Sequence, residues 1–178
     1  RVLREPRLRA LEAAWRGVEL LLARCPREGV EVELLDVDPA EPETALVHVV
    51  VRRHAAADAP PPPSLLLLDA TFSRSAADLA RLELIAETGE ALQTPIVVGV
   101  GADFLGVELP AFGKLDHPAG QLERGLERWA SLRGKPALRW LVAATNRVLL
   151  RDDLWGHPGF VVLAAAAGSV ARTGWPGE

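Results

Sequence analysis

Two aspartates stand where an α/β sheet often carries its chemistry. Asp69 closes the apolar run 65–68, and Asp103 follows a second apolar run at 94–100. Carboxylates at the carboxyl ends of neighbouring parallel strands can bind a metal ion or transfer a proton. The serines and threonines that follow Asp69 are also typical of helix caps, which favours a structural role for this turn. The aspartate pair is therefore the basis of an enzyme alternative.

The other reactive residue types lack the spacing that their chemistry needs. The glycines between 99 and 106 are followed neither by Gly-Lys-Ser/Thr nor by a helix start, so they do not match a phosphate-binding loop. The four histidines are scattered, and no serine stands in a Gly-x-Ser-x-Gly turn. Cys25, the single cysteine, is expected to be a core thiol. We predict no catalytic residue, no cofactor and no metal.

Length and composition favour one folded domain over residues 1–178. Hydrophobic residues make up 49% and charged residues 25% of the chain, and the net charge is −4, without a dense basic stripe for nucleic acid. No apolar run approaches the roughly 20 residues of a membrane span. A single cysteine favours a reducing, cytoplasmic location. The absence of Met indicates a piece of a longer protein.

The elements that must position these residues follow an α/β pattern. Apolar residues at spacings of three and four predict an amphipathic helix over 6–25, and residues 30–38 alternate like a half-buried strand. The runs 65–68 and 94–100 enclose an expected helix over 75–90, which is typical of parallel strands joined by a crossover.

The rest of the chain extends this pattern. We expect helices over 119–132 and 157–172, a strand over 138–144, and an extended connector at the four prolines 60–63. Residues 44–54 have the valines of a strand, but their spacing and acidic first turn favour a helix. The predicted fold is a three-layer α/β sandwich with a mainly parallel central sheet flanked by helices.

Five tryptophans occur without any tyrosine: Trp15, Trp129, Trp140, Trp155 and Trp175. An indole ring buries a large area and offers one N–H donor, so it serves in a core or as an interface anchor. We expect a core position for each tryptophan except Trp175, which lies in a Pro- and Gly-rich tail.

Several short phrases fall at the starts and ends of the predicted elements, in a fixed order. They are Trp15-Arg16-Gly17, the run 65–68 with Asp69 and Phe72, Trp129 with Arg133, Arg147 with the apolar residues after it, Trp155-Gly156 before an Ala-rich stretch, and Trp175. This series resembles the central region of the TssC family, the large subunit of the type VI secretion contractile sheath. The likeness covers nearly the whole chain and departs from the family at Asn146 and His157.

The resemblance implies a bacterial structural protein. A large sheath subunit assembles with a small sheath subunit and with neighbouring large subunits into a helical tube around an inner tube, and contraction of the tube drives secretion. Trp15, Asp69 and Trp155 would then organise fold and packing. Two alternatives stay open: a doubly wound ligand-binding or enzyme domain that uses Asp69 and Asp103, and a non-polymerising adaptor or baseplate-like component of the same system.

Overall fold

The fold was obtained as a computed structural model, which describes residues 5–38, 40–55, 58–101, 104, 111, 114 and 127–174. The chain divides into two compact units. The central unit is Val37–Thr145, and the discontinuous unit joins Arg1–Asp36 with Asn146–Glu178. Helices and a parallel sheet occur together, so the α/β class is confirmed. The single domain over 1–178 stays a prediction.

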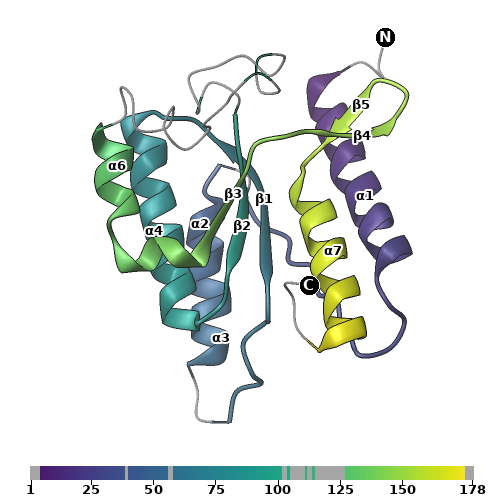
Figure 1. Ribbon diagram of the computed structural model, residues 1–178, viewed down its shortest axis with the longest axis horizontal. Coiled ribbons are helices and arrows are strands. Elements are labelled where there is room, and N and C mark those ends of the chain that lie inside the picture. The colour runs from purple at the N-terminus through teal and green to yellow at the C-terminus, as the bar shows by residue number, and fades with distance from the viewer. Residues whose placement is uncertain are drawn as a thin grey trace. The chain divides into compact units, whose positions relative to one another are not determined.

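The central unit is built on a parallel three-stranded sheet in the order β1-β2-β3. Its strands are β1 (Leu66–Phe72), β2 (Ile96–Val100) and β3 (Leu141–Ala144). Helix α4 (Ala76–Leu92) connects β1 to β2 and lies alongside the sheet (Figure 1). The predicted strand–helix–strand unit is therefore confirmed.

Helix α4 begins after Ser75, and its buried residues include those that the sequence predicts to face the core. The Ser75 hydroxyl caps it by accepting a hydrogen bond of 3.1 Å from the backbone N–H of Asp78. Its apolar residues meet the sheet in one core, in which Leu82, Ile85 and Ile96 have no exposed surface. At about 25 cal/mol per Å² of buried apolar area, side chains of this kind supply most of the unit's stability.

Shorter helices complete the central unit. They are α2 (Pro42–Ala45), the π-helix η2 (Leu46–Val51), α3 (Arg52–His54), α6 (Glu127–Arg133) and the 3₁₀-helix η5 (Pro136–Trp140). The helical prediction for 44–54 is confirmed, although its middle is a π-helix. The strand predicted over 138–144 starts only at Leu141, because η5 occupies the preceding residues. Of the helix predicted over 119–132, the described residues include only the end.

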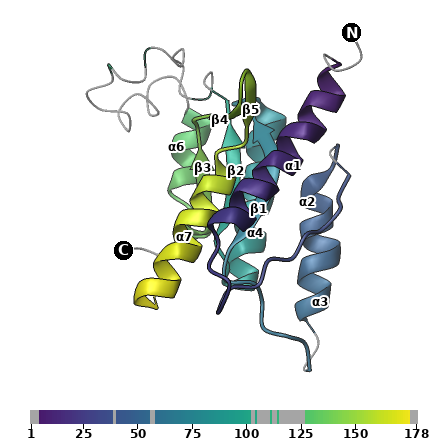
Figure 2. The same ribbon diagram turned by 90° about the vertical axis from the view of Figure 1, so that its right-hand side faces the viewer.

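The discontinuous unit contains two long helices and a hairpin. Helix α1 (Pro6–Arg24) packs on α7 (Gly159–Thr173), as Figures 1 and 2 show. Strands β4 (Val148–Arg151) and β5 (Leu154–Gly156) pair antiparallel. Both helices are confirmed, whereas the hairpin was not predicted.

The strand predicted over residues 30–38 is wrong. No regular element forms there, and Leu34 and Leu35 are exposed. An alternating pattern makes a strand only where a neighbouring strand can complete its hydrogen bonds and cover its apolar face. Neither condition is met in this segment.

Candidate functional site

The contact between α1 and α7 depends on Gly17. A Cβ atom built at Gly17 would lie 2.3 Å from two ring carbons of Phe160, and the buried Leu21 follows one turn later. Glycine inside a helix costs roughly 0.5–1 kcal/mol relative to alanine. The close approach of the Phe160 ring therefore explains why glycine stands here.

Four large apolar side chains of α1 lie on its other side. Leu8, Leu11, Trp15 and Leu22 are all exposed, Trp15 by 61% and Leu11 by 56%. Successive residues turn by about 100° around a helix, so this row lies nearly opposite Gly17. We call these four residues the α1 stripe. The expectation that Trp15 lies in the core is wrong, because the helix contact is made by the glycine two residues later.

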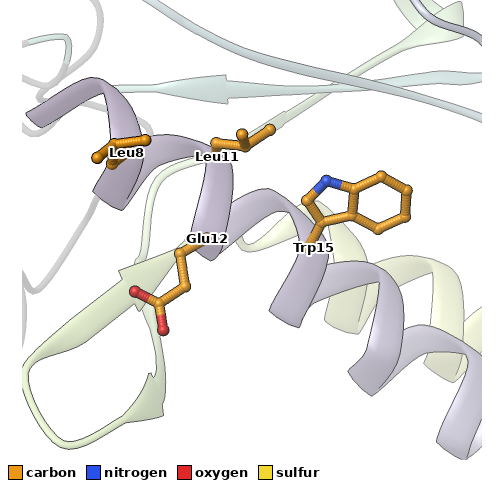
Figure 3. A pocket seen from close by; sticks show the side chains of 4 residues that line it. All are labelled: Leu8, Leu11, Glu12 and Trp15. Carbon is orange, nitrogen blue, oxygen red and sulfur yellow. The ribbon is translucent and has the colours of Figure 1, made fainter. Parts of the chain in front are cut away.

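Part of the α1 stripe borders an open hollow. Leu8, Leu11 and Trp15 line it together with Glu12. In Figure 3 the three apolar side chains follow one another along the helix, and the Glu12 carboxylate leaves the helix on a neighbouring side. One carboxylate beside an indole and two leucines can receive an apolar stem that ends in a positive charge. Among the four residues that line the hollow, Glu12 is the single ionisable group, so the hollow has no pair of groups such as a nucleophile and its base.

A second carboxylate, that of Glu19, lies about two turns further along the same flank. The Arg16 guanidinium donates to the carboxylate of Glu19 over 2.7 Å, and this hydrogen bond raises the pKa of Arg16. Arg16, which belongs to the phrase Trp15-Arg16-Gly17, therefore forms an ion pair within α1. Ion pairs of this exposed kind contribute little stability.

The phrase Trp155-Gly156 repeats the arrangement found at Trp15 and Gly17. Trp155 is 51% exposed and pairs across the hairpin with the exposed Leu149. Gly156 is buried, and a Cβ atom there would lie 2.4 Å from a side-chain carbon of Leu150. The core position expected for Trp155 is therefore also wrong. In both phrases a buried glycine permits a close contact and a nearby tryptophan faces outward.

The hairpin is fastened to α1 by a polar contact. The Arg9 guanidinium donates to the Asp153 carboxylate over 3.1 Å and to the Asp153 carbonyl oxygen over 2.8 Å. Arg147 lies exposed just before β4. The contact holds the hairpin that carries Trp155 against the helix that carries Trp15.

Asp69 is not at the end of its strand. Strand β1 continues to Phe72, so Asp69 lies inside it and is exposed. The register against β2 shifts between Leu67 and Thr71, and this irregularity lets the strand resume after the aspartate. The predicted strand end at residue 68 is wrong for that reason. Asp103, the other member of the predicted pair, is outside the described residues.

Metal and nucleophile chemistry find little support in the described part of the chain. No group of three or more His, Cys, Asp or Glu side chains there could hold a metal ion. Cys25 is half-buried, and burial raises the pKa of its thiol. A raised pKa keeps this thiol protonated at neutral pH and so poorly nucleophilic.

Three further residues of the ordered phrases lie in the central unit. Phe72 is almost fully buried, and Trp129, in the core as expected, meets Phe104 edge to face with ring centres 4.9 Å apart. Arg133 is exposed near the end of α6. Buried aromatic pairs of this geometry contribute roughly 0.5–1.5 kcal/mol beyond their area. Trp175 is outside the described residues.

A charged cluster in the central unit was not predicted. Arg81 forms two hydrogen bonds of 2.8 Å with the Glu43 carboxylate, and its guanidinium lies 5.3 Å from the centre of the Phe72 ring. Asp78 accepts hydrogen bonds from the hydroxyl and the N–H of Ser73 over 2.6 and 2.8 Å. The pattern Ser75-x-x-Asp78 is a helix-start signal that could have placed Asp78, whereas the Glu43 contact is long-range.

Burial and hydrogen bonding act in opposite directions on these carboxylates. Burial alone would raise the pKa of Glu43 and of Asp78, but hydrogen bonds from Arg81 and Ser73 outweigh it and lower both pKa values. The hydrogen bond to Glu43 raises the pKa of Arg81. The cluster thus favours the charged forms and fastens α2 to α4.

Comparison with known proteins adds no assignment: no protein family matches this chain, and no curated protein matches it either.

Among the described helices, none combines the length and the apolar character that crossing a bilayer would require.

Proposed function

We propose that this chain is a structural domain of a contractile type VI secretion sheath, related to the large sheath subunit. In this role it assembles in the cytoplasm with a small sheath subunit and neighbouring large subunits around an inner tube. The proposal rests on the ordered phrases of the sequence and on how two of them are arranged. It assigns the chain a mechanical role without catalysis.

One observation carries the proposal: Trp15 and Trp155 are both more than half exposed, each close to a buried glycine. Exposed indoles are costly to keep in water and are enriched among residues that anchor protein interfaces. A catalytic tryptophan would instead be expected beside convergent polar groups in a pocket. The arrangement therefore supports packing surfaces between subunits.

The enzyme alternative keeps less support. It requires Asp69 at a strand end beside Asp103, and Asp69 lies within β1. The adaptor alternative shares the packing surfaces and differs only in whether subunits continue into a tube. A tube requires head-to-tail contacts that do not close on themselves.

Co-expression with a small sheath subunit tests the proposal. The full-length protein that contains this chain is produced with the small subunit of the same genome, and particles are examined by negative-stain electron microscopy. We expect tubes that contain both proteins. A variant with Trp15→Ala and Trp155→Ala should lose tubes while the purified chain stays folded by circular dichroism. A matched control, Leu34→Ala, removes an exposed leucine outside the phrases and should leave tubes intact.

The outcomes separate the proposals. A soluble complex of both proteins without tubes would favour the adaptor alternative, and the absence of any complex would overturn the sheath assignment. For the enzyme alternative, a panel of divalent metals and nucleotides should raise the melting temperature if one of them binds the native chain.

A further inference from the structure

We infer that the four prolines 60–63 form a polyproline II ridge that docks into a groove lined by aromatic side chains on a partner protein. We call these four residues the proline ridge. The ridge lies entirely within the central unit. The inference goes beyond the sheath assignment and does not depend on it.

The sequence fixes the backbone of the proline ridge by steric constraint. A proline ring holds φ at about −65°, and a residue that precedes a proline is pushed out of the helical region into extended backbone. Pro60, Pro61 and Pro62 are subject to both constraints, because each is followed by another proline. Polyproline II, which rises about 3.1 Å per residue without internal hydrogen bonds, satisfies both. The ridge accordingly belongs to neither a helix nor a strand.

Hydrogen bonds hold the ridge at both ends. The Nδ1 atom of His54 donates to the Pro60 carbonyl oxygen over 2.7 Å, since a carbonyl oxygen can only accept. The Thr94 hydroxyl donates to the Pro63 carbonyl oxygen over 2.8 Å. Thr94 is 1% exposed, so this second anchor belongs to the core of the unit. Two anchors reduce the conformational freedom that the segment would otherwise lose on binding.

Between the anchors the ridge faces outward. Pro60, Pro61 and Pro62 are exposed, and Pro63 is half-buried. Figures 1 and 2 show this part of the chain as an extended trace between the end of α3 and β1, at one end of the central unit. Packing in the core therefore does not explain why three successive exposed positions are all proline.

The chemistry of the ridge selects an aromatic partner surface. The exposed prolines present apolar rings and carbonyl acceptors, and they have no N–H to donate. Tryptophan and tyrosine match both features, because their rings pack on apolar surface and their N–H or O–H group donates a hydrogen bond. SH3, WW and EVH1 domains bind proline-rich segments in aromatic-lined grooves and exploit the preformed polyproline II backbone. A domain with such a groove is the occupant that fits the ridge.

Three purified domains, one each of the SH3, WW and EVH1 type, test the ridge on the full 178-residue chain. Each domain is first shown to bind its own proline-rich peptide. Chemical-shift changes of the isotope-labelled domain then show whether the chain occupies the aromatic groove. We expect at least one domain to bind the chain through this groove, and an excess of its own peptide to displace the chain.

Substitutions in the chain locate the binding. A three-alanine variant with Pro60→Ala, Pro61→Ala and Pro62→Ala removes the exposed rings and should weaken binding at least about tenfold. The matched control Pro136→Ala replaces an exposed proline at the start of η5 and should change binding less than about twofold. Circular dichroism and urea unfolding confirm that each variant is folded.

A further variant tests the anchors. His54→Ala removes the hydrogen bond to Pro60 and leaves all four prolines in place. Binding should weaken by about two- to fivefold, because the ridge is then less ordered before it binds. An unchanged affinity would reject the claim that the chain holds the ridge ready for docking.

Three results would overturn the inference: no domain binds the chain although each binds its own peptide, the shifts lie outside the aromatic groove, or the three-alanine variant binds as tightly as the wild-type chain. Sedimentation equilibrium of the chain by itself provides a further check. A dimer that the three-alanine variant dissociates would assign the ridge to a second copy and reject the partner domain. Failure of the ridge would leave the tube experiment as an independent test of the sheath assignment.

Discussion

In the central unit most of the large apolar side chains are buried, with Leu84 and Val142 as exposed exceptions, whereas in the discontinuous unit many of them are exposed. Leu82, Ile85 and Ile96 are fully buried between helix and sheet, while Leu11 and Trp15 are more than half exposed on α1. The difference follows from which residues make the contacts. The sheet and α4 meet through long side chains. Helices α1 and α7 meet closely at Gly17, and the four residues of the α1 stripe remain exposed.

The largest expected effect lies in the enclosed core. Leu82→Ala removes a fully buried side chain and leaves a cavity, so it should lower the free energy of unfolding by about 2–5 kcal/mol. Urea unfolding followed by circular dichroism measures the change. Leu11→Ala is the matched control, because it makes the same substitution on the exposed stripe. An equal loss at both positions would mean that the two units do not differ in the way described.

The next effect lies in the contact between α1 and α7. Gly17→Val introduces atoms where the Phe160 ring already lies, so overpacking should cost about 1–3 kcal/mol of unfolding free energy. The partner substitution Phe160→Ala removes the three ring carbons that a side chain at position 17 would meet. The double variant should therefore lose less stability than the sum of the two single variants, by about 0.5 kcal/mol or more. Simple additivity in this double-mutant cycle would argue against the close contact at Gly17.

A smaller effect is expected at the charged cluster of the central unit. Arg81→Met removes both hydrogen bonds to Glu43, and its side chain is 31% exposed, so the loss should be roughly 1–2 kcal/mol at neutral pH. Urea unfolding at pH 7 measures it. The exposed pair Arg16 and Glu19 supplies the control, since Arg16→Met should change little. Equal effects would show that burial of the cluster is unimportant.

The same cluster has a defined pH dependence. Glu43 and Asp78 have pKa values lowered by folding, so their contribution is present above the ordinary carboxylate pKa of about 4 and is lost as pH falls through the lower folded values. The stability difference between the wild-type chain and Arg81→Met should therefore shrink below about pH 4. A difference that stays constant between pH 7 and pH 3 would contradict the proposed charge pairing.

The sequence predicts the central unit better than the discontinuous one, and the reason is physical. The buried strand β2 and the Ser75 cap of α4 are encoded by adjacent residues, so local pattern is sufficient. The length of β1 depends on its pairing with β2, whose register shifts between Leu67 and Thr71. Because the strand continues after this shift, Asp69 lies inside β1, and the apolar run 65–68 alone could not predict this. The hairpin at 148–156 has short strands and an exposed Trp155, so its alternation is weak.

The direction in which α1 faces could not be read from its periodicity. Spacing by three and four finds the apolar row from Leu8 to Leu22, but a row of large residues is normally assigned to the core. The contact with α7 depends instead on Gly17 and on Phe160, which lies 143 residues further along the chain. A long-range contact made by a residue without a side chain leaves no periodic signal in a single sequence.

The smallest expected effect tests the outward-facing stripe. Trp15→Ala should change the unfolding free energy by no more than about 0.5 kcal/mol, since an exposed side chain away from core contacts contributes little to folding. Trp129→Ala, the matched change at a buried indole, should cost about 3–5 kcal/mol. Urea unfolding of both variants makes the comparison directly. If Trp15→Ala were as destabilising as Trp129→Ala, the indole would be part of the chain's own core in solution. A near-neutral Trp15→Ala that prevents tube formation in the co-expression experiment would instead assign the exposed indole to packing between subunits.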